Sequence, residues 1–417
     1  MHPERSQDGV DLKNGGSIDI FGAANLGVAA MENWGLILVQ QRHLIFNKDE
    51  SAQDVMAKVM REDQSNRAHP LSSSIDKPVD PKAFFSKISY LKGQLVSRMI
   101  EGIVTPQVFR RGVQNFLKRF KHRNADHHDL INALTEIHDP HENDDKLIAN
   151  NLTLEEVIGT WIYKKGCPTL VVRLVDEKAN RVSVRQESHQ MLLGMEDNNQ
   201  TTWIVPLFLR DSMNNSNVAS WLISNETELL YLGSDLILDY EARTYSRFFY
   251  DGPLYERIVK TFRRDLHDIP VASRIRIVDD AFALAERGYL SYNISLTLAF
   301  AIRYDTNFMP VRMCYAHFEN MWWQFSRQPQ IGTFNTFLKI FLSPKFEESM
   351  RFDDVDTLPF YMDKLRELVL YSLCDLGHRP CLKFVQKHFA RLRETCALLP
   401  LSNHSCNLYV IRFFLFH

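Results

Sequence analysis

The stretch Ala29–Leu36 reads Ala-Ala-Met-Glu-Asn-Trp-Gly-Leu and leads into the short apolar run Gly35–Val39. This run and an earlier one at Ile18–Phe21 have the length of β-strands, so the chain is predicted to begin with a small β-structured part. From Pro81 the apolar residues recur at three- and four-residue steps, which predicts helices over 90–100, 108–120 and 129–137. We therefore expect a first unit, residues 1–150, in which helices follow a few strands.

The composition is that of a packed globular protein. The chain has 417 residues, of which 45% are hydrophobic and 24% are charged, and this excludes a disordered, fibrous or disulfide-dense class. The net charge of −2 makes nucleic acid an unexpected partner. No apolar run approaches the roughly 20 residues that cross a bilayer, and the polar start lacks a signal-peptide core. The expectation is a soluble chain with no membrane span and no signal peptide.

Two further units follow the first. Residues 168–246 carry several short apolar or alternating segments separated by Asn, Asp and Ser clusters, which predicts an antiparallel β-sandwich over 151–246. From Leu254 the pattern is helical again, and short loops separate the segments. This predicts a solenoid-like helical domain over 247–417, with helices near 254–266, 272–287, 292–303, 311–326, 334–342, 358–375 and 381–394.

Cysteines and glycosylation triplets give weak signals about the compartment. Of the six cysteines, Cys374 and Cys381 are seven residues apart, within reach of a disulfide that closes a small loop. Several Asn-x-Ser/Thr triplets also occur, and together with the cysteine pair they indicate extracellular or membrane-anchored ancestry. The polar start points the other way, so the compartment stays open.

The motifs carry a family resemblance in the correct order along the chain. Ala29–Leu36 resembles the Gly-Ala-Met-Glu-Asn-Trp-Gly-Leu signature of the zinc aminopeptidases typified by aminopeptidase N, the gluzincin metallopeptidases, with Ala29 in place of the first glycine. Ile88–Gly93 resembles the family's Ile-Ser/Ala-Tyr-x-Lys-Gly motif. Weaker matches extend the likeness over residues 18–395, at Thr160-Trp161, Gly166–Pro168, Trp203–Leu207, Tyr245–Asp251 and Asp279–Phe282.

The resemblance implies an α+β multidomain fold. Its parts would be a remnant of a thermolysin-like, mostly helical catalytic domain, an antiparallel β-sandwich and an incomplete C-terminal α-helical solenoid. It also implies a disulfide between Cys374 and Cys381, whose spacing matches that of extracellular members.

The resemblance assigns roles to the two strongest motifs. Glu32 matches the glutamate that binds the free amine of a peptide substrate, through a charge-assisted hydrogen bond. Its neighbours in the same block are the expected substrate-binding positions, namely Ala29, Ala30, Met31 and Asn33. Tyr90 matches the tyrosine that stabilises the oxyanion of the transition state. Without a metal and its water Tyr90 would be idle, and we expect it to be a partly buried aromatic with a local partner.

The zinc-binding segment of the family is absent from the sequence. Family members place His-Glu-x-x-His and a further glutamate between the two motifs, but here Ser51-Ala52 runs directly into sequence that resembles the downstream part. None of the three ligands or the general base can be assigned, so we predict no metal ligand and no bound cofactor. Loss of these helices should leave apolar surface uncovered, which makes residues 1–150 the part expected to fold least well.

Other candidate groups give weaker signals. His122, His127 and His128 form one cluster, and His138 and His141 beside Glu142 form another. Both are interpreted as solvated loop histidines rather than metal ligands. Ser72–Ser74 lacks the context of a catalytic serine and is interpreted as a polar loop, and Met321–Trp323 is interpreted as core.

Three hypotheses about function follow. The first is a catalytically inactive aminopeptidase-like protein that binds peptides with a free N-terminus, or that associates with a full-length family member. The alternative is an active zinc metalloaminopeptidase, a hydrolase of peptide catabolism, either with a site rebuilt from His138, His141 and Glu142 or as a longer product of which this chain is a truncated form. The third is an incomplete gene product, which transcript sequencing across Ser51-Ala52 would reveal.

Overall fold

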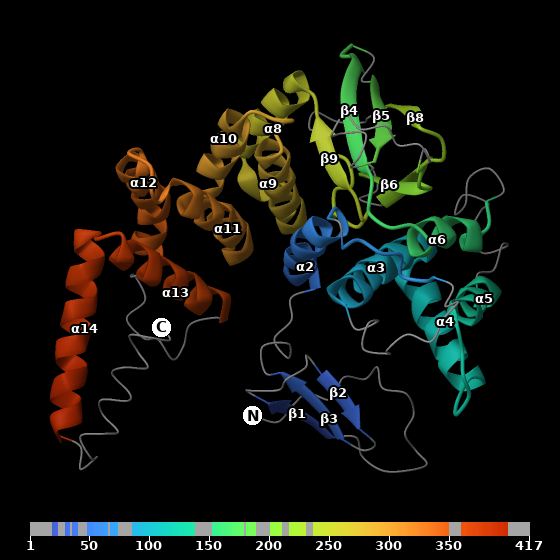
Figure 1. Cartoon of the computed structure of the whole chain (residues 1–417), viewed down its shortest axis with the longest axis horizontal. Helices are drawn as coiled ribbons and strands as arrows, with labels where there is room; N and C mark the ends of the chain where they lie inside the picture. The colour runs from blue at the N-terminus through green and yellow to red at the C-terminus, as the bar shows by residue number, and fades with distance from the viewer. Residues whose placement is uncertain are drawn as a thin grey trace.

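A computed structural model describes most of the chain (Figure 1). The described residues are 19–23, 30–33, 36–40, 48–65, 67–73, 86–137, 152–178, 181–188, 201–210, 217–230, 237–349 and 360–398. Within these ranges, none of the helices combines the length and the apolar character that crossing a membrane requires.

Three short strands near the N-terminus form one small sheet, which lies below helices α2 and α3 in Figure 1. They are β1 (Asp19–Ala23), β2 (Ala30–Asn33) and β3 (Leu36–Gln40). β3 lies in the middle, pairs in parallel with β1 and pairs antiparallel with β2. The apolar runs predict β1 and β3, whereas the four residues of β2 carry no strand pattern of their own. Among the described strands, β2 is therefore an edge strand.

The next helices pack together and enclose a core. They are α2 (Lys48–Asp63), the π-helical turn η2 (Ile88–Lys92), α3 (Gly93–Val104), α4 (Pro106–Arg119), α5 (His127–Ile137) and α6 (Leu154–Ile162). Met60, Met99 and Leu134 are each at most 1% exposed. Gly112 lets α4 approach α5 closely, since a Cβ there would lie 3.0 Å from the Cα of Leu134. These buried positions belong to the core that runs through the described chain.

Helix α6 joins this helical part to the strands. Its start is a capping box, in which the Glu156 backbone N–H donates to Thr153 Oγ1 at 3.2 Å and Glu156 Oε2 accepts from the Thr153 backbone N–H at 2.7 Å. Near its end, the fully buried Trp161 donates its indole N–H to the Ile204 carbonyl at 3.0 Å. The helical and β-structured parts therefore share one core.

The strands form two described sheets. The larger has the order β8-β5-β4-β9 and the smaller pairs β6 with β7. Most neighbours are antiparallel, as predicted, but β9 runs parallel to β4. The prediction of a wholly antiparallel sandwich is wrong for this pair. The chain passes from β8, at one edge of the sheet, to the opposite edge before β9 begins, and β9 therefore runs in the same direction as β4. The strands are β4 (Thr169–Asp176), β5 (Arg181–Glu187), β6 (Val205–Arg210), β7 (Asn217–Leu222), β8 (Glu226–Leu230) and β9 (Arg247–Tyr250).

The rest of the described chain is helical and curves away from the strands (Figure 1). Each predicted segment is a helix. They are α8 (Gly252–Arg264), the 3-10 turn η4 (Leu266–Asp268), α9 (Val271–Glu286), α10 (Tyr292–Ile302), α11 (Phe308–Phe325), α12 (Ile331–Ser349), α13 (Phe360–Asp375) and α14 (Arg379–Leu398). A disulfide between Cys374 and Cys381, with Cα atoms 5.3 Å apart, links α13 to α14.

A buried ionic cluster fastens β9 to α9. Arg247 Nη1 donates to Asp279 Oδ2 at 2.9 Å and to Asp280 Oδ1 at 2.8 Å, and Asp280 Oδ2 also accepts the Phe248 backbone N–H at 2.9 Å. His317 on α11 lies 2.9 Å from Asp279 Oδ1. Burial would raise the pKa of Asp279, but the charge of Arg247 and the hydrogen bond from His317 lower it below its usual range. Burial raises the pKa of Asp280 to about 6, and the charge of Asp279 adds to that rise.

The raised pKa of Asp280 predicts a pH dependence of stability. A carboxyl that binds its proton more tightly when folded contributes stability that is complete below its unfolded pKa and is lost as pH rises through the folded pKa of about 6. We expect the free energy of unfolding of the unmodified chain to fall, relative to Asp280→Asn, by about 1 kcal/mol between pH 5 and 7.5. Urea unfolding of both proteins across that range measures the difference.

The exposed Asp268 offers a matched control. Asp268→Asn should leave the slope of stability against pH unchanged over the same range. If Asp280→Asn and Asp268→Asn give the same slope, then Asp280 is not the titrating group.

Candidate functional site

Tyr90 lies on the π-helical turn η2, directly before α3. The turn buries Ile88 and Lys92 but leaves the Tyr90 side chain 61% exposed. The expectation of a partly buried Tyr90 is therefore wrong, because the wide π turn holds its neighbours inward and presents the phenol ring to the outside. Single π turns inside helices are often found at functional sites.

Lys92 anchors this turn from inside the protein. Its ammonium group is fully buried and lies 3.0 Å from Asp63 Oδ2, which is itself buried at the end of α2. It also donates to the carbonyls of Lys164 at 3.0 Å and Gly166 at 2.9 Å. The three N–H donors of the lysine thus have three acceptors, as a buried ammonium requires.

Asp63 in turn binds three partners from distant parts of the chain. Oδ1 accepts the Gly166 backbone N–H at 3.0 Å, and Oδ2 accepts the Tyr245 hydroxyl at 3.1 Å as well as the Lys92 ammonium. Gly166 has φ +80°, a left-handed conformation that glycine adopts without strain. Burial raises the pKa of the neighbouring Cys167 thiol to about 12, so this cysteine stays protonated and is a poor nucleophile.

His69 and Ser86 form a second polar contact at the base of the turn. His69 Nδ1 lies 2.8 Å from the Pro70 carbonyl, so it must be the protonated nitrogen that donates there. His69 Nε2 then accepts from Ser86 Oγ at 2.7 Å. Ser86 Oγ also accepts the Ser89 backbone N–H at 3.0 Å, which caps the start of the helix. This contact fixes where the helix that carries Tyr90 begins.

Most of the predicted substrate-binding block lies on β2. Ala30, Met31, Glu32 and Asn33 are the four residues of this strand, and Glu32 pairs with Ile37 of β3. The Met31 side chain is 45% exposed. Ala29 lies outside the described residues. The block and Tyr90 thus belong to separate elements, the small sheet and the turn before α3 (Figure 1).

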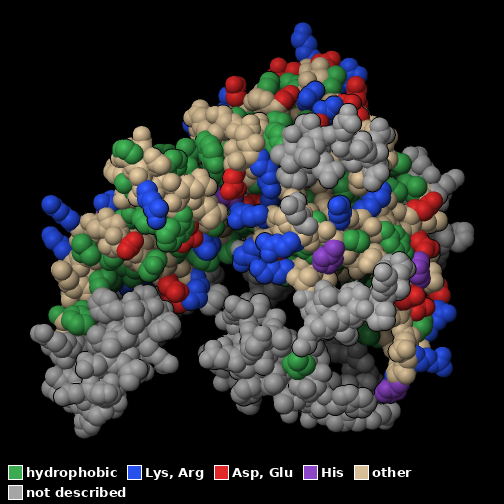
Figure 2. Space-filling model, viewed as in Figure 1, with side chains coloured by type: hydrophobic (Ala, Val, Ile, Leu, Met, Phe, Trp, Pro, Cys, Tyr) green, Lys and Arg blue, Asp and Glu red, His purple; other side chains and the backbone are tan. Residues whose placement is uncertain are grey.

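The described residues do not fit a zinc ion. Zinc in a catalytic site needs three protein ligands, yet the described part of the chain holds no group of three His, Cys, Asp or Glu side chains that could supply them. The histidines visible in Figure 2 lie at separate places on that face. In the whole sequence no two of the 15 histidines are four residues apart, the spacing that puts two imidazoles on one side of a helix.

His127 and His128, two members of the first histidine cluster, lie on α5 and contact protein side chains. His127 Nε2 contacts the Tyr163 hydroxyl at 2.5 Å, and His128 Nδ1 contacts Glu155 Oε1 at 2.8 Å. These contacts tie α5 to α6. His122 is exposed in the preceding turn.

The other candidate residues lie on loops, on α11 or outside the described ranges. His138, His141 and Glu142 lie outside the described residues. Ser72 and Ser73 follow α2 outside any helix or strand, as expected for a polar loop, and Ser74 lies outside the described residues. Of the aromatic run on α11, Met321 and Trp322 pack against the core, but Trp323 is 73% exposed. The core interpretation is wrong for Trp323, because the helix turns that position outward.

Comparison with known proteins identifies two family domains. The profile of the "Peptidase family M1 domain" matches residues 50–161, and that of the "ERAP1-like C-terminal domain" matches residues 236–403. The first range contains Tyr90 and Lys92 but begins after Glu32. Together the two profiles cover both described helical regions.

Individual relatives match over long stretches at low identity. Endoplasmic reticulum aminopeptidase 2 of Homo sapiens is 22% identical over 391 residues, 87% of this chain and 40% of the relative. Thyrotropin-releasing hormone-degrading ectoenzyme of Homo sapiens is 29% identical over 272 residues, 62% of this chain and 25% of the relative. Aminopeptidase N of Haemonchus contortus is 23% identical over 358 residues, 81% of this chain and 36% of the relative. The chain thus spans less than half the length of each of these relatives.

The buried pair of Lys92 and Asp63 predicts a large loss of stability on substitution. Lys92→Met keeps the bulk of the side chain but leaves Asp63 buried without a cation, which should cost about 3–5 kcal/mol in the free energy of unfolding. Denaturant unfolding followed by circular dichroism measures this loss. Lys87→Met, at an exposed lysine five residues earlier, should change stability by less than about 0.5 kcal/mol. Equal stabilities of the two variants would contradict a structural role for Lys92.

Proposed function

Because the chain belongs to the M1 family of zinc aminopeptidases, we propose that it is a non-hydrolytic member that binds peptides through their free N-terminus. Two features support this: the amine-binding motif at Ala30–Asn33 is kept, and His-Glu-x-x-His is absent from the 417 residues. The absence of the motif is the observation that carries the proposal. We further propose the division into units at residues 1–150, 151–246 and 247–417.

Hydrolysis of a peptide bond at neutral pH requires a strong nucleophile. In a zinc enzyme the ion supplies one by lowering the pKa of its bound water to about 7. His141-Glu142 is the one His-Glu pair of this sequence, and it lacks a second histidine at the required spacing. The sequence holds no His-Glu-x-x-His, and the described residues offer no three-ligand set, so in this proposal no activated water attacks the bound peptide.

Peptide binding needs no activated water, only groups that hold the peptide. β2 is an edge strand of its described sheet, and an edge strand can pair with an extended peptide through main-chain hydrogen bonds. In this proposal the carboxylate of Glu32 forms a charge-assisted hydrogen bond with the peptide's N-terminal ammonium. The backbone of Ala30 and Met31 would then hold the first residues of the peptide. The exposed Tyr90 side chain is a further group that a bound peptide could reach.

A second candidate function is that of an active zinc metalloaminopeptidase, either in this chain or in a longer product that contains it. It is favoured by the names of the relatives described above, two of which are called aminopeptidases, and by the fact that the chain spans 25% to 40% of these relatives. In that case zinc ligands would come from residues outside the described ranges or outside this chain. The two functions differ in whether the protein turns over a substrate.

The role of Glu32 in peptide binding can be tested with a labelled peptide that has a free N-terminus. We expect Glu32→Gln to weaken binding by about tenfold or more, because a charged hydrogen bond to the ammonium is lost. N-acetylation of the peptide should have a similar effect on the unmodified chain. Fluorescence anisotropy measures both affinities.

Glu256→Gln is the matched control, since Glu256 is exposed on α8. It should leave peptide affinity unchanged. A peptide affinity that changes neither with Glu32→Gln nor with N-acetylation would refute the amine-binding role. Separately, cleavage of an aminoacyl reporter that a chelator abolishes, with about one zinc per chain, would favour the active enzyme instead.

A further inference from the structure

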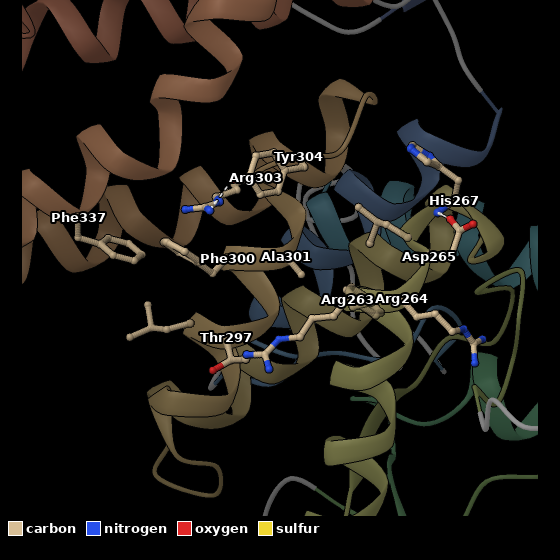
Figure 3. Close-up of a pocket in the computed structure, with 13 residues that line it drawn as sticks. Arg263, Arg264, Asp265, His267, Thr297, Phe300, Ala301, Arg303, Tyr304 and Phe337 are labelled. Carbon is tan, nitrogen blue, oxygen red and sulfur yellow. Dashed lines mark hydrogen bonds between the residues drawn. The ribbon is translucent and has the colours of Figure 1, made fainter.

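A cavity of about 720 Å³ lies among the C-terminal helices, far along the chain from the motifs described above. It is formed by the end of α8, the turn η4, helix α10 with the turn that follows it, and one residue of α12 (Figure 3). Its size lies within the range of cavities that enclose small organic ligands. Three arginines and three aromatic rings stand out in its lining, namely Arg263, Arg264, Arg303, Phe300, Tyr304 and Phe337.

Arg303 is held in place by aromatic rings rather than by a carboxylate. Its guanidinium carbon lies 3.8 Å from the centre of the Phe300 ring and 4.5 Å from that of Tyr304. Nη2 donates to the Tyr304 hydroxyl at 2.5 Å, while Nε is buried without a hydrogen-bond partner. No carboxylate among the described residues pairs with Arg303. Its charge is therefore not neutralised, and the stacked guanidinium is already ordered for a ligand.

Arg263 adds a second positive charge from another element. It lies in the last turn of α8, and Figure 3 shows its guanidinium extending beside Thr297 of α10. Within the described ranges it forms no ion pair with a carboxylate. Asp265 is the one acidic residue of the lining, and its carboxylate already accepts the His267 backbone N–H at 2.9 Å. The cavity thus has an excess of positive charge.

The apolar part of the lining lies between these charges. In Figure 3 the Phe300 ring lies below Arg303, with Phe337 on one side. Phe300 is 37% exposed, and its ring centre is 6.3 Å from that of Phe337. A ligand that touches the arginines would therefore also meet an exposed aromatic surface.

We propose that this cavity binds an organic phosphate that carries an aromatic ring, the chemistry of a nucleoside diphosphate. A guanidinium group matches phosphate oxygens with two parallel hydrogen bonds, and two such groups from separate helices suit a ligand with more than one anionic group. The aromatic ring of the ligand stacks on the Phe300 side of the cavity, as bases do on aromatic side chains. The site is separate from the peptide-binding role proposed for Glu32.

The proposal is tested by titrating the full chain with ADP in an isothermal calorimeter. We expect saturable binding of one ADP per chain that weakens as salt is raised, because the guanidinium groups face solvent on one side. Adenosine and inorganic phosphate are the two partial probes. Each should bind at least about tenfold more weakly than ADP, since each lacks one half of the recognised chemistry.

Two single substitutions locate the site. Arg303→Met and Arg263→Met each remove one guanidinium group and should weaken ADP binding by about tenfold or more. Arg327→Met is the control, because Arg327 is exposed on the same helical domain but outside the cavity. Thermal unfolding of each variant shows whether it is folded, and a Phe300→Leu variant tests the stacking surface without removing charge.

Several results would overturn the proposal. The site does not exist as described if ADP fails to bind, or if Arg303→Met and Arg263→Met both bind ADP as well as Arg327→Met does. Inorganic phosphate binding as tightly as ADP would show a simple anion site without recognition of the ring. Should Arg303→Met unfold, Arg263→Met and Phe300→Leu still decide between these outcomes.

Discussion

The ion pair between Lys92 and Asp63 is the contact on which the arrangement of the first helices depends. Both groups are fully buried, so each would be costly if it stood alone. The cost is offset because the ammonium has three acceptors and the carboxylate three donors, drawn from α2, η2, the loop that contains Gly166 and the segment before β9. Four parts of the chain that are distant in sequence therefore have to meet at one point before the two buried charged groups have all their hydrogen-bond partners.

The buried ionic cluster around Arg247 likewise holds together distant elements in the second half of the molecule. It joins β9 to α9 and, through His317, to α11, so the sheet and the helical array are held by charge as well as by apolar packing. Burial disfavours the charged form of both Asp279 and Asp280, which share Arg247. Asp279 also accepts from His317, so its pKa is lowered while that of Asp280 is raised. The same geometry that fixes the joint also makes it sensitive to pH.

The sequence predicted the parts of the fold that depend on local pattern. Helices α8 to α14 follow from apolar spacing and short loops, and β3, β4 and β5 follow from apolar runs. β2 and β8 carry no strand pattern of their own, because each is short and mixes polar with apolar residues. The parallel pairing of β9 with β4 depends on a distant return of the chain, and the burial of Lys92 depends on acceptors more than 70 residues away. For the candidate site, the family resemblance pointed to the residues of β2 and to Tyr90, but neither the exposure of Tyr90 nor the anchor beneath it could be predicted from the sequence.

The anchor changes what the motif Ile88–Gly93 indicates about function. Ile88 and Lys92 are buried and hold the turn against α2, while Tyr90 alone among these three faces outward. A chain that folds this way needs the isoleucine and the lysine whether or not it catalyses a reaction, since without the lysine Asp63 would be a buried charge with no cation beside it. The motif is therefore strong evidence for the fold of an aminopeptidase and weak evidence for its activity. Evidence for activity has to come from residues whose sole use is the reaction, and the zinc ligands are residues of that kind.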